Sequence, residues 1–141
     1  MTDALTLAKY IVTKCVQDDY PISNLQLQKI LYFVQVETLK RNGKPAFYDE
    51  IEAWKFGPVI PNVYYHFCGF GAMPIWSKYK YDDSELTDKE MINEVVEKKR
   101  TLDPWDLVEE AHKKNGPWDR VYRNGEGNRE VISIKMIKEV G

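Results

Sequence analysis

The chain has 141 residues, 43% apolar and 30% charged, and its 22 acidic and 20 basic side chains leave a formal net charge of −2. That length is enough for one domain whose core buries roughly two-thirds of the surface exposed by the unfolded chain. The balanced charge provides no overall field toward nucleic acid or an anionic membrane, and no apolar run approaches the roughly 20 residues of a membrane span.

The N-terminal segment predicts a helix rather than a secretion signal. The start MTDALTLAKYIV lacks a basic stretch before an apolar core and a small-residue cleavage site, so we expect a cytoplasmic protein. Cys15 falls on the apolar side of this helix and is expected to be a buried thiol, and Cys68 is also expected to be reduced. The apolar side consists of Leu5, Ala8, Ile11, Val12 and Cys15.

A second helix has explicit start and stop signals. Ser23 can cap it, with Gln26 three residues later completing a capping box, so the helix should begin near Asn24. Gly43 suits a left-handed C-terminal residue, and Pro45 cannot continue the helix.

The apolar pattern of this helix predicts one buried face. The buried stripe is Leu27, Ile30, Leu31, Val34 and Thr38. The polar residues Gln28, Lys29, Gln35 and Lys40 are expected mainly off that stripe.

A short strand and a turn are predicted next. Ile51 and Ala53 alternate with polar or aromatic neighbours, which is typical of a strand. Gly57 and Pro58 are expected to turn the chain, because a glycine before proline takes extended or positive-φ backbone cheaply. Pro61 then opens a further helix with Val59, Val63, Tyr64 and Phe67 on its buried side.

Three later helices also show start signals. Thr87 and Glu90 form a capping-box pattern, Asp103 precedes a proline at a first helical position, and Ser133 precedes the last apolar run. The sequence therefore predicts a mainly α, compact single-domain helical fold over residues 1–141, with a small β element around residues 50–56.

Four segments together resemble a known family. LQLQKILYFVQ, GKPAFYDEIEAWKFGPVIPNVYYHF, WDLVEEAHKKNGPW and VISIKMIKE look like the Panacea antitoxin domain, also called the SocA-like or phage-associated GepA-like domain. The resemblance runs from about Ala4 to Val140. Its motif residues here are Glu52, Trp54, Gly57, Pro58, Gly116, Pro117 and Trp118.

The resemblance implies a non-catalytic protein without a cofactor. Such a protein neutralises a co-encoded toxin by binding it, or acts as a proteolytic adaptor that delivers the toxin to an ATP-dependent protease. The sequence is compatible with both routes.

Aromatic residues crowd between positions 54 and 81, which suits either a core or a protein interface. Trp76, Tyr79 and Tyr81 lie in a polar stretch where a core role is least expected, so they are the first candidates for partner binding. Tyr64 and Tyr65 are the next candidates. Stacked aromatics could also bind single-stranded nucleic acid, but that requires a basic groove, and the acidic residues at 82, 83 and 85 argue against one.

An enzyme is the hypothesis from a different class. Such an enzyme would use His112 or His66. His112 could act as a general base beside a nucleophile, although a partly buried histidine near a helix C-terminus explains it without catalysis. His66 and Cys68 offer only two zinc ligands where four are needed. The basic runs 98–100 and 113–114 alternate with glutamates and are expected to form solvated mixed-charge faces.

Overall fold

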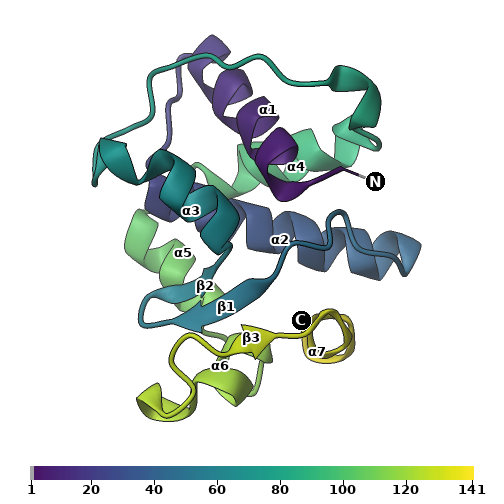
Figure 1. Ribbon diagram of the computed structural model, residues 1–141, viewed down its shortest axis with the longest axis vertical. Helices are drawn as coiled ribbons and strands as arrows, with labels where there is room; N and C mark the ends of the chain where they lie inside the picture. The colour runs from purple at the N-terminus through teal and green to yellow at the C-terminus, as the bar shows by residue number, and fades with distance from the viewer. Residues whose placement is uncertain (1) are drawn as a thin grey trace.

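The long helix α2 (Asn24–Asn42) is the centre of the fold. The structure is a computed structural model that describes residues 2–141, and these residues form seven α-helices and a three-stranded antiparallel sheet. Helices α1, α3, α4, α5 and α7 and strand β2 all pack against α2, which crosses the middle of the molecule in Figure 1. The other elements are α1 (Ala4–Gln17), β1 (Ile51–Trp54), β2 (Gly57–Val59), α3 (Pro61–Phe67), α4 (Lys89–Lys99), α5 (Pro104–Ala111), α6 (Pro117–Tyr122), β3 (Val131–Ile132) and α7 (Ile134–Val140).

Helix α2 begins and ends where the sequence predicts. The Ser23 side chain accepts from the Gln26 backbone N–H, the reciprocal half of the capping box is present, and Gly43 closes the helix at φ 73°. Both signals involve partners only three or four residues away.

The prediction of a single buried face on α2 is wrong. Gln28, Lys29 and Gln35 are at most 1% exposed, because other elements surround the helix on several sides. Internal hydrogen bonds replace water for the two amides. Gln28 accepts from the Ile60 backbone N–H at 2.9 Å, and Gln35 donates to the Phe47 carbonyl at 2.8 Å.

The predicted β element is a hairpin. Strand β1 buries Ile51 and Ala53 and pairs with β2 in a register that sets Trp54 opposite Gly57. The turn residues are Lys55 and Phe56, so the expectation of a turn at Gly57 and Pro58 is wrong by two residues. Gly57 begins β2 at φ +115°, which a side chain would disfavour.

A third strand, which the sequence did not predict, completes the sheet. β3 pairs antiparallel with β1, in the strand order β2-β1-β3, and sets Ile132 opposite Ile51. Two residues are too few to show a period of two.

Two of the three later start signals are confirmed. Asp103 accepts from the Trp105 N–H at 2.9 Å, and Ser133 accepts from the Met136 N–H at 3.0 Å. The capping box at Thr87 is wrong, because α4 starts at Lys89 after Asp88, whose φ of 56° leaves the first turn without a side-chain cap.

Candidate functional site

The two motif segments of the chain meet at one corner of the fold. The Trp118 indole N–H donates to the Trp54 carbonyl at 2.7 Å, which joins the start of α6 to the hairpin. Gly116 precedes α6, and an added Cβ there would lie 3.0 Å from the Lys113 carbonyl oxygen. Pro117 occupies the first turn of α6, where its missing N–H costs nothing. Glu52 accepts from the Trp54 indole at 2.9 Å. These contacts hold the corner together.

Lys29 lies buried beneath this corner. Its side chain is 1% exposed, and Nζ donates to the Pro58 carbonyl at 3.2 Å. Among residues 2–141, no carboxylate forms an ion pair with Lys29. Burial lowers the pKa of the Lys29 ammonium to about 7, because charge is costly away from water. An ammonium has three donors, and Lys29 has a single hydrogen-bond acceptor within the described residues.

His112 lies against the same glycine as Lys29. A Cβ at Gly57 would lie 2.9 Å from Lys29 Cε and 3.5 Å from His112 Nε2. The His112 ring stacks on Trp118 with centroids 3.6 Å apart, and its buried Nε2 has no hydrogen-bond partner in the described chain. Burial lowers the pKa of His112, and the nearby Lys29 charge lowers it further. His112 follows the last turn of α5 and is partly buried, as the non-catalytic interpretation predicts.

A mostly apolar cavity of about 320 Å³ borders Lys29. We call it the Lys29 pocket. The polar side chains of Asn24 and Gln28 in its wall are occupied, since Gln28 donates to Asn24 and Asn24 donates to the Tyr64 carbonyl. The lining residues are Asn24, Leu25, Gln28, Lys29, Trp54, Lys55, Phe56, Val59, Tyr64, Cys68, Gly71 and Ala72.

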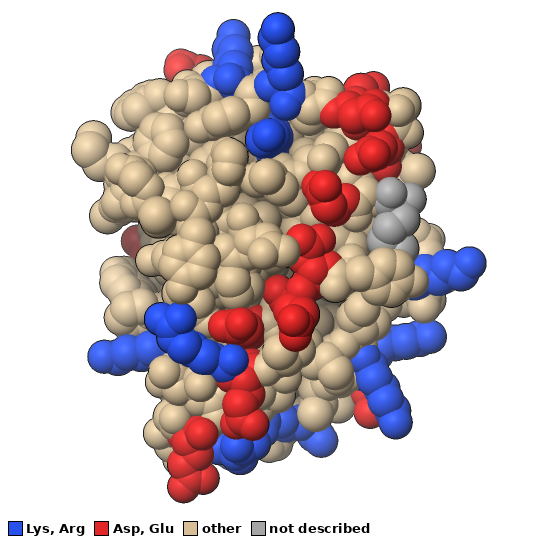
Figure 2. All heavy atoms as spheres, viewed as in Figure 1, with Lys and Arg blue, Asp and Glu red and all other residues tan. Residues whose placement is uncertain are grey.

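One wall of this pocket belongs to a long uncharged stretch of sequence. From Phe56 to Ser77 the chain contains no Asp, Glu, Lys or Arg, and we call this stretch the uncharged segment. Figure 2 shows the surface over α3 largely free of charged side chains, while Asp and Glu side chains run down the middle of the same face. The segment exposes large apolar side chains, namely Phe56, Tyr65, Met73 and Trp76.

The aromatic residues singled out in the sequence have different environments. Trp76 is 59% exposed and Tyr65 is 56% exposed. Tyr64 is half-buried, and its ring packs against the Trp54 ring with the centroids 5.0 Å apart.

Tyr79 and Tyr81 pack against the core instead of standing free in a polar loop. The Tyr79 ring packs edge-on against the buried Phe67 ring, with the ring centroids 5.4 Å apart. The ring centroids of Tyr81 and Tyr10 are 5.6 Å apart. Both tyrosines are partly buried, so less of each ring is available to a partner than at Trp76.

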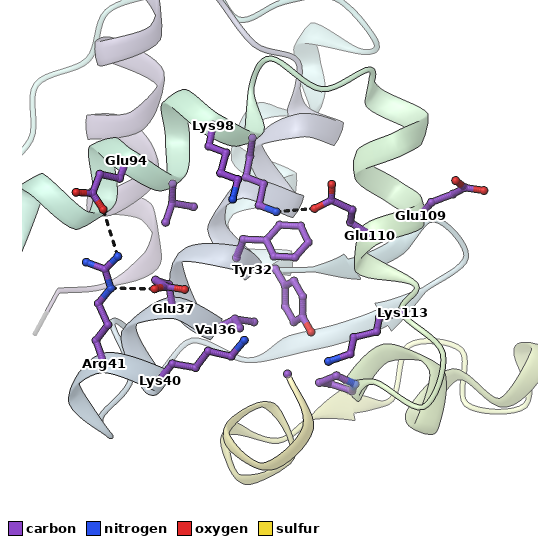
Figure 3. Close-up of a pocket in the computed structure, with 15 residues that line it drawn as sticks. Tyr32, Val36, Glu37, Lys40, Arg41, Glu94, Lys98, Glu109, Glu110 and Lys113 are labelled. Atoms are coloured by element: carbon purple, nitrogen blue, oxygen red, sulfur yellow. Dashed lines mark hydrogen bonds and ion pairs between the residues drawn. The ribbon is translucent and has the colours of Figure 1, made fainter.

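A second, larger hollow has mutually compensating charges. Figure 3 shows this groove, about 600 Å³ in volume, with Tyr32 beneath charged side chains of α2, α4 and α5. Arg41 binds Glu37 at 2.8 Å and Glu94 at 3.2 Å, and Lys99 binds Glu110 at 2.5 Å. Such pairs leave little net field for an anionic or cationic ligand.

The basic run that borders this groove is less solvated than the sequence predicts. Lys99 Nζ lies over the Phe33 ring, 4.2 Å from the ring centroid. Arg100 is partly buried and binds Asp18 at 2.8 Å. Long basic side chains often cover apolar surface in this way.

Residues 2–141 contain no group of three or more His, Cys, Asp or Glu side chains arranged to hold a metal ion. Cys15 is buried and Cys68 is exposed, and both are free thiols, as expected. His66 is exposed, and its ring contacts Phe67 at 4.8 Å. None of the helices in the described part of the chain is long and apolar enough to cross a membrane.

Comparison with known proteins identifies the family of this chain. Residues 27–119 match the family model described as antitoxin SocA-like, Panacea domain. The chain belongs to the SocA-like antitoxin family. It is also 33% identical to antitoxin SocA of Caulobacter vibrioides (strain NA1000 / CB15N), an alignment that covers 98% of this chain and 79% of the relative. No solved structure matches the chain.

The match makes this chain an antitoxin of the SocA type, and the predicted family resemblance is confirmed. The matched residues include the hairpin, Lys29, His112 and the GPW corner of this Panacea domain. Sequence reasoning missed Lys29, since a lysine beside an amphipathic stripe reads as exposed. The uncharged segment was detectable in the sequence by its missing charges alone.

Proposed function

We propose that the chain neutralises a co-encoded toxin by direct, stoichiometric binding, without catalysis and in the cytoplasm. Membership of the SocA-like antitoxin family supports a toxin as the partner. The two free cysteines suit a reducing compartment.

The observation that carries the proposal is the exposed apolar surface of the uncharged segment. Large apolar side chains that gather on an exposed surface mark protein interaction sites. Aromatic anchors supply most of the binding energy at many interfaces. Trp76 and Tyr65 are the two most exposed aromatic residues of this segment.

The test is a titration of the protein encoded by the neighbouring reading frame against purified variants. Trp76→Ala and Tyr65→Ala remove exposed rings from the uncharged segment, and Tyr48→Ala removes a ring that is 66% exposed outside it. A hot-spot ring contributes about 2 kcal/mol or more, so at least one of the first two changes should weaken binding some thirtyfold. Tyr48→Ala should bind as the parent does.

Two results would overturn the proposal. Unchanged affinity for both segment variants would remove this surface from the interface. Protection of cells through loss of the toxin, without a stable complex between the two purified proteins, would favour delivery of the toxin to a protease.

A further inference from the structure

The Lys29 pocket combines a buried lysine with a mostly apolar wall. Among residues 2–141, the charged side chains that line it are those of Lys29 and Lys55, and none of the lining side chains is acidic. Near neutral pH the Lys29 amine is only partly protonated, because burial disfavours its charge. Its charged form has one carbonyl acceptor among residues 2–141, and an unpaired charge in an apolar setting costs several kcal/mol. A bound carboxylate would supply the missing charge and the missing acceptors.

The neighbouring groups cannot serve as that counter-ion. His112, which also lies against Gly57, has an imidazole that is neutral or positively charged, so it cannot balance the charge of an ammonium. The amides of Asn24 and Gln28 are engaged with each other and with backbone. The anion therefore has to come from outside the described chain.

The wall of the pocket indicates what accompanies the anion. Leu25, Val59 and the rings of Trp54, Phe56 and Tyr64 make most of the lining apolar. The pocket also borders the uncharged segment, whose exposed rings are suited to a protein surface. A partner protein can present a carboxylate and a large apolar side chain together.

We propose that the Lys29 pocket receives a carboxylate of the partner protein, carried beside a large apolar side chain, and that Lys29 is its counter-ion. This inference rests on the proposed neutralisation by direct binding and adds the chemistry of one contact. Rotation of the flexible lysine stem moves the ammonium from the Pro58 carbonyl toward the bound carboxylate.

The first experiment tests the pocket without the toxin. N-acetyl-L-phenylalanine offers a ring and a carboxylate, whereas N-acetyl-L-phenylalaninamide offers the ring alone. Both are titrated into the isotope-labelled full chain and followed by NMR. The acid should shift the amide signals of pocket residues and bind about tenfold or more tightly than the amide, as a charge-assisted hydrogen bond requires. Equal binding, or none, would overturn the role of Lys29.

Variants assign the effect to one lysine. Lys29→Met should abolish the preference for the acid, while Lys55→Met, at an exposed lysine of the same pocket, should keep it. If Lys29→Met does not fold, calorimetry on the parent in buffers of different ionisation enthalpy replaces it. Proton uptake on binding the acid near neutral pH is then expected, and zero uptake would contradict Lys29 as the counter-ion. His112 is the other titratable group that lies against Gly57.

The toxin itself provides the decisive comparison. Lys29→Met should weaken its complex about tenfold or more, and Lys55→Met should not. If the small acid binds but Lys29→Met leaves toxin affinity unchanged, the occupant is a free carboxylic acid and the proposal is wrong, although neutralisation by binding still holds. If the parent forms no complex, the proposed function fails, and the titration with the small acid still judges the pocket.

Discussion

Replacing Gly57 with alanine should destabilise the whole fold through two separate effects. Gly57 has φ +115°, where a Cβ strains the backbone, and that Cβ would lie 2.9 Å from Lys29 Cε. Strained backbone costs about 1–3 kcal/mol, and displacing Lys29 from its hydrogen bond to Pro58 costs about 1 kcal/mol more. The sum is about 2–4 kcal/mol, or a fall of about 6–15 °C in melting midpoint for a chain of this size.

Gly125 provides a matched control for the backbone effect. It has φ +104°, and no atom lies within 4 Å of its would-be Cβ. Gly125→Ala should therefore show the strain alone, and thermal unfolding followed by circular dichroism measures both variants. The difference between the two losses in stability measures the steric clash with Lys29. This difference should shrink in a Lys29→Ala background, where the clashing atoms are absent. Equal losses for the two glycine variants would refute the close approach of Lys29 to Gly57.

Three further predictions concern single side chains. Burial lowers the pKa of Lys29 from 10.5 to about 7. At a pH between these two values, the unfolded chain therefore binds more protons than the folded chain. The free energy of unfolding should then rise with pH, by up to about 1.4 kcal/mol per unit, and urea titrations should show this rise in the parent but not in Lys29→Met. Trp118→Phe removes the donor to the Trp54 carbonyl and should cost about 1–3 kcal/mol in urea unfolding; an unchanged midpoint would contradict that tie. Ser23→Ala should cost about 1 kcal/mol in thermal unfolding, whereas Thr87→Ala should stay within about 0.5 kcal/mol, and equal losses would show that Thr87 does cap its helix.

The features that the sequence predicts correctly depend on neighbours within one turn. Ser23 and Gly43 mark the ends of α2 because their partners are three or four residues away. Thr87 carries the same pattern but fails, since Asp88 takes a left-handed conformation that breaks the first turn. Local chemistry permits a cap, and the path of the surrounding chain decides whether it forms.

The candidate site depended on contacts that no local pattern contains. Lys29 is buried because the hairpin at Gly57 closes over it. His112 approaches the same glycine from a helix much later in the chain. The aromatic rings at 79 and 81 pack on the core through contacts with α1 and α3. Each of these requires tertiary structure, so residue type and spacing could propose the participants but not their environments.

The third strand has a consequence for where the folding unit ends. The family match stops at residue 119, yet β3, which starts at Val131, forms one side of β1, and α7 packs against α2. A chain shortened to the matched region would leave β1 with unpaired N–H and C=O groups along an open edge. Such edges recruit strands from other molecules, so the shortened protein would tend to self-associate into aggregates. The last twenty or so residues thus cover the strand edge of the hairpin that carries the motif, and so protect it from pairing with other molecules.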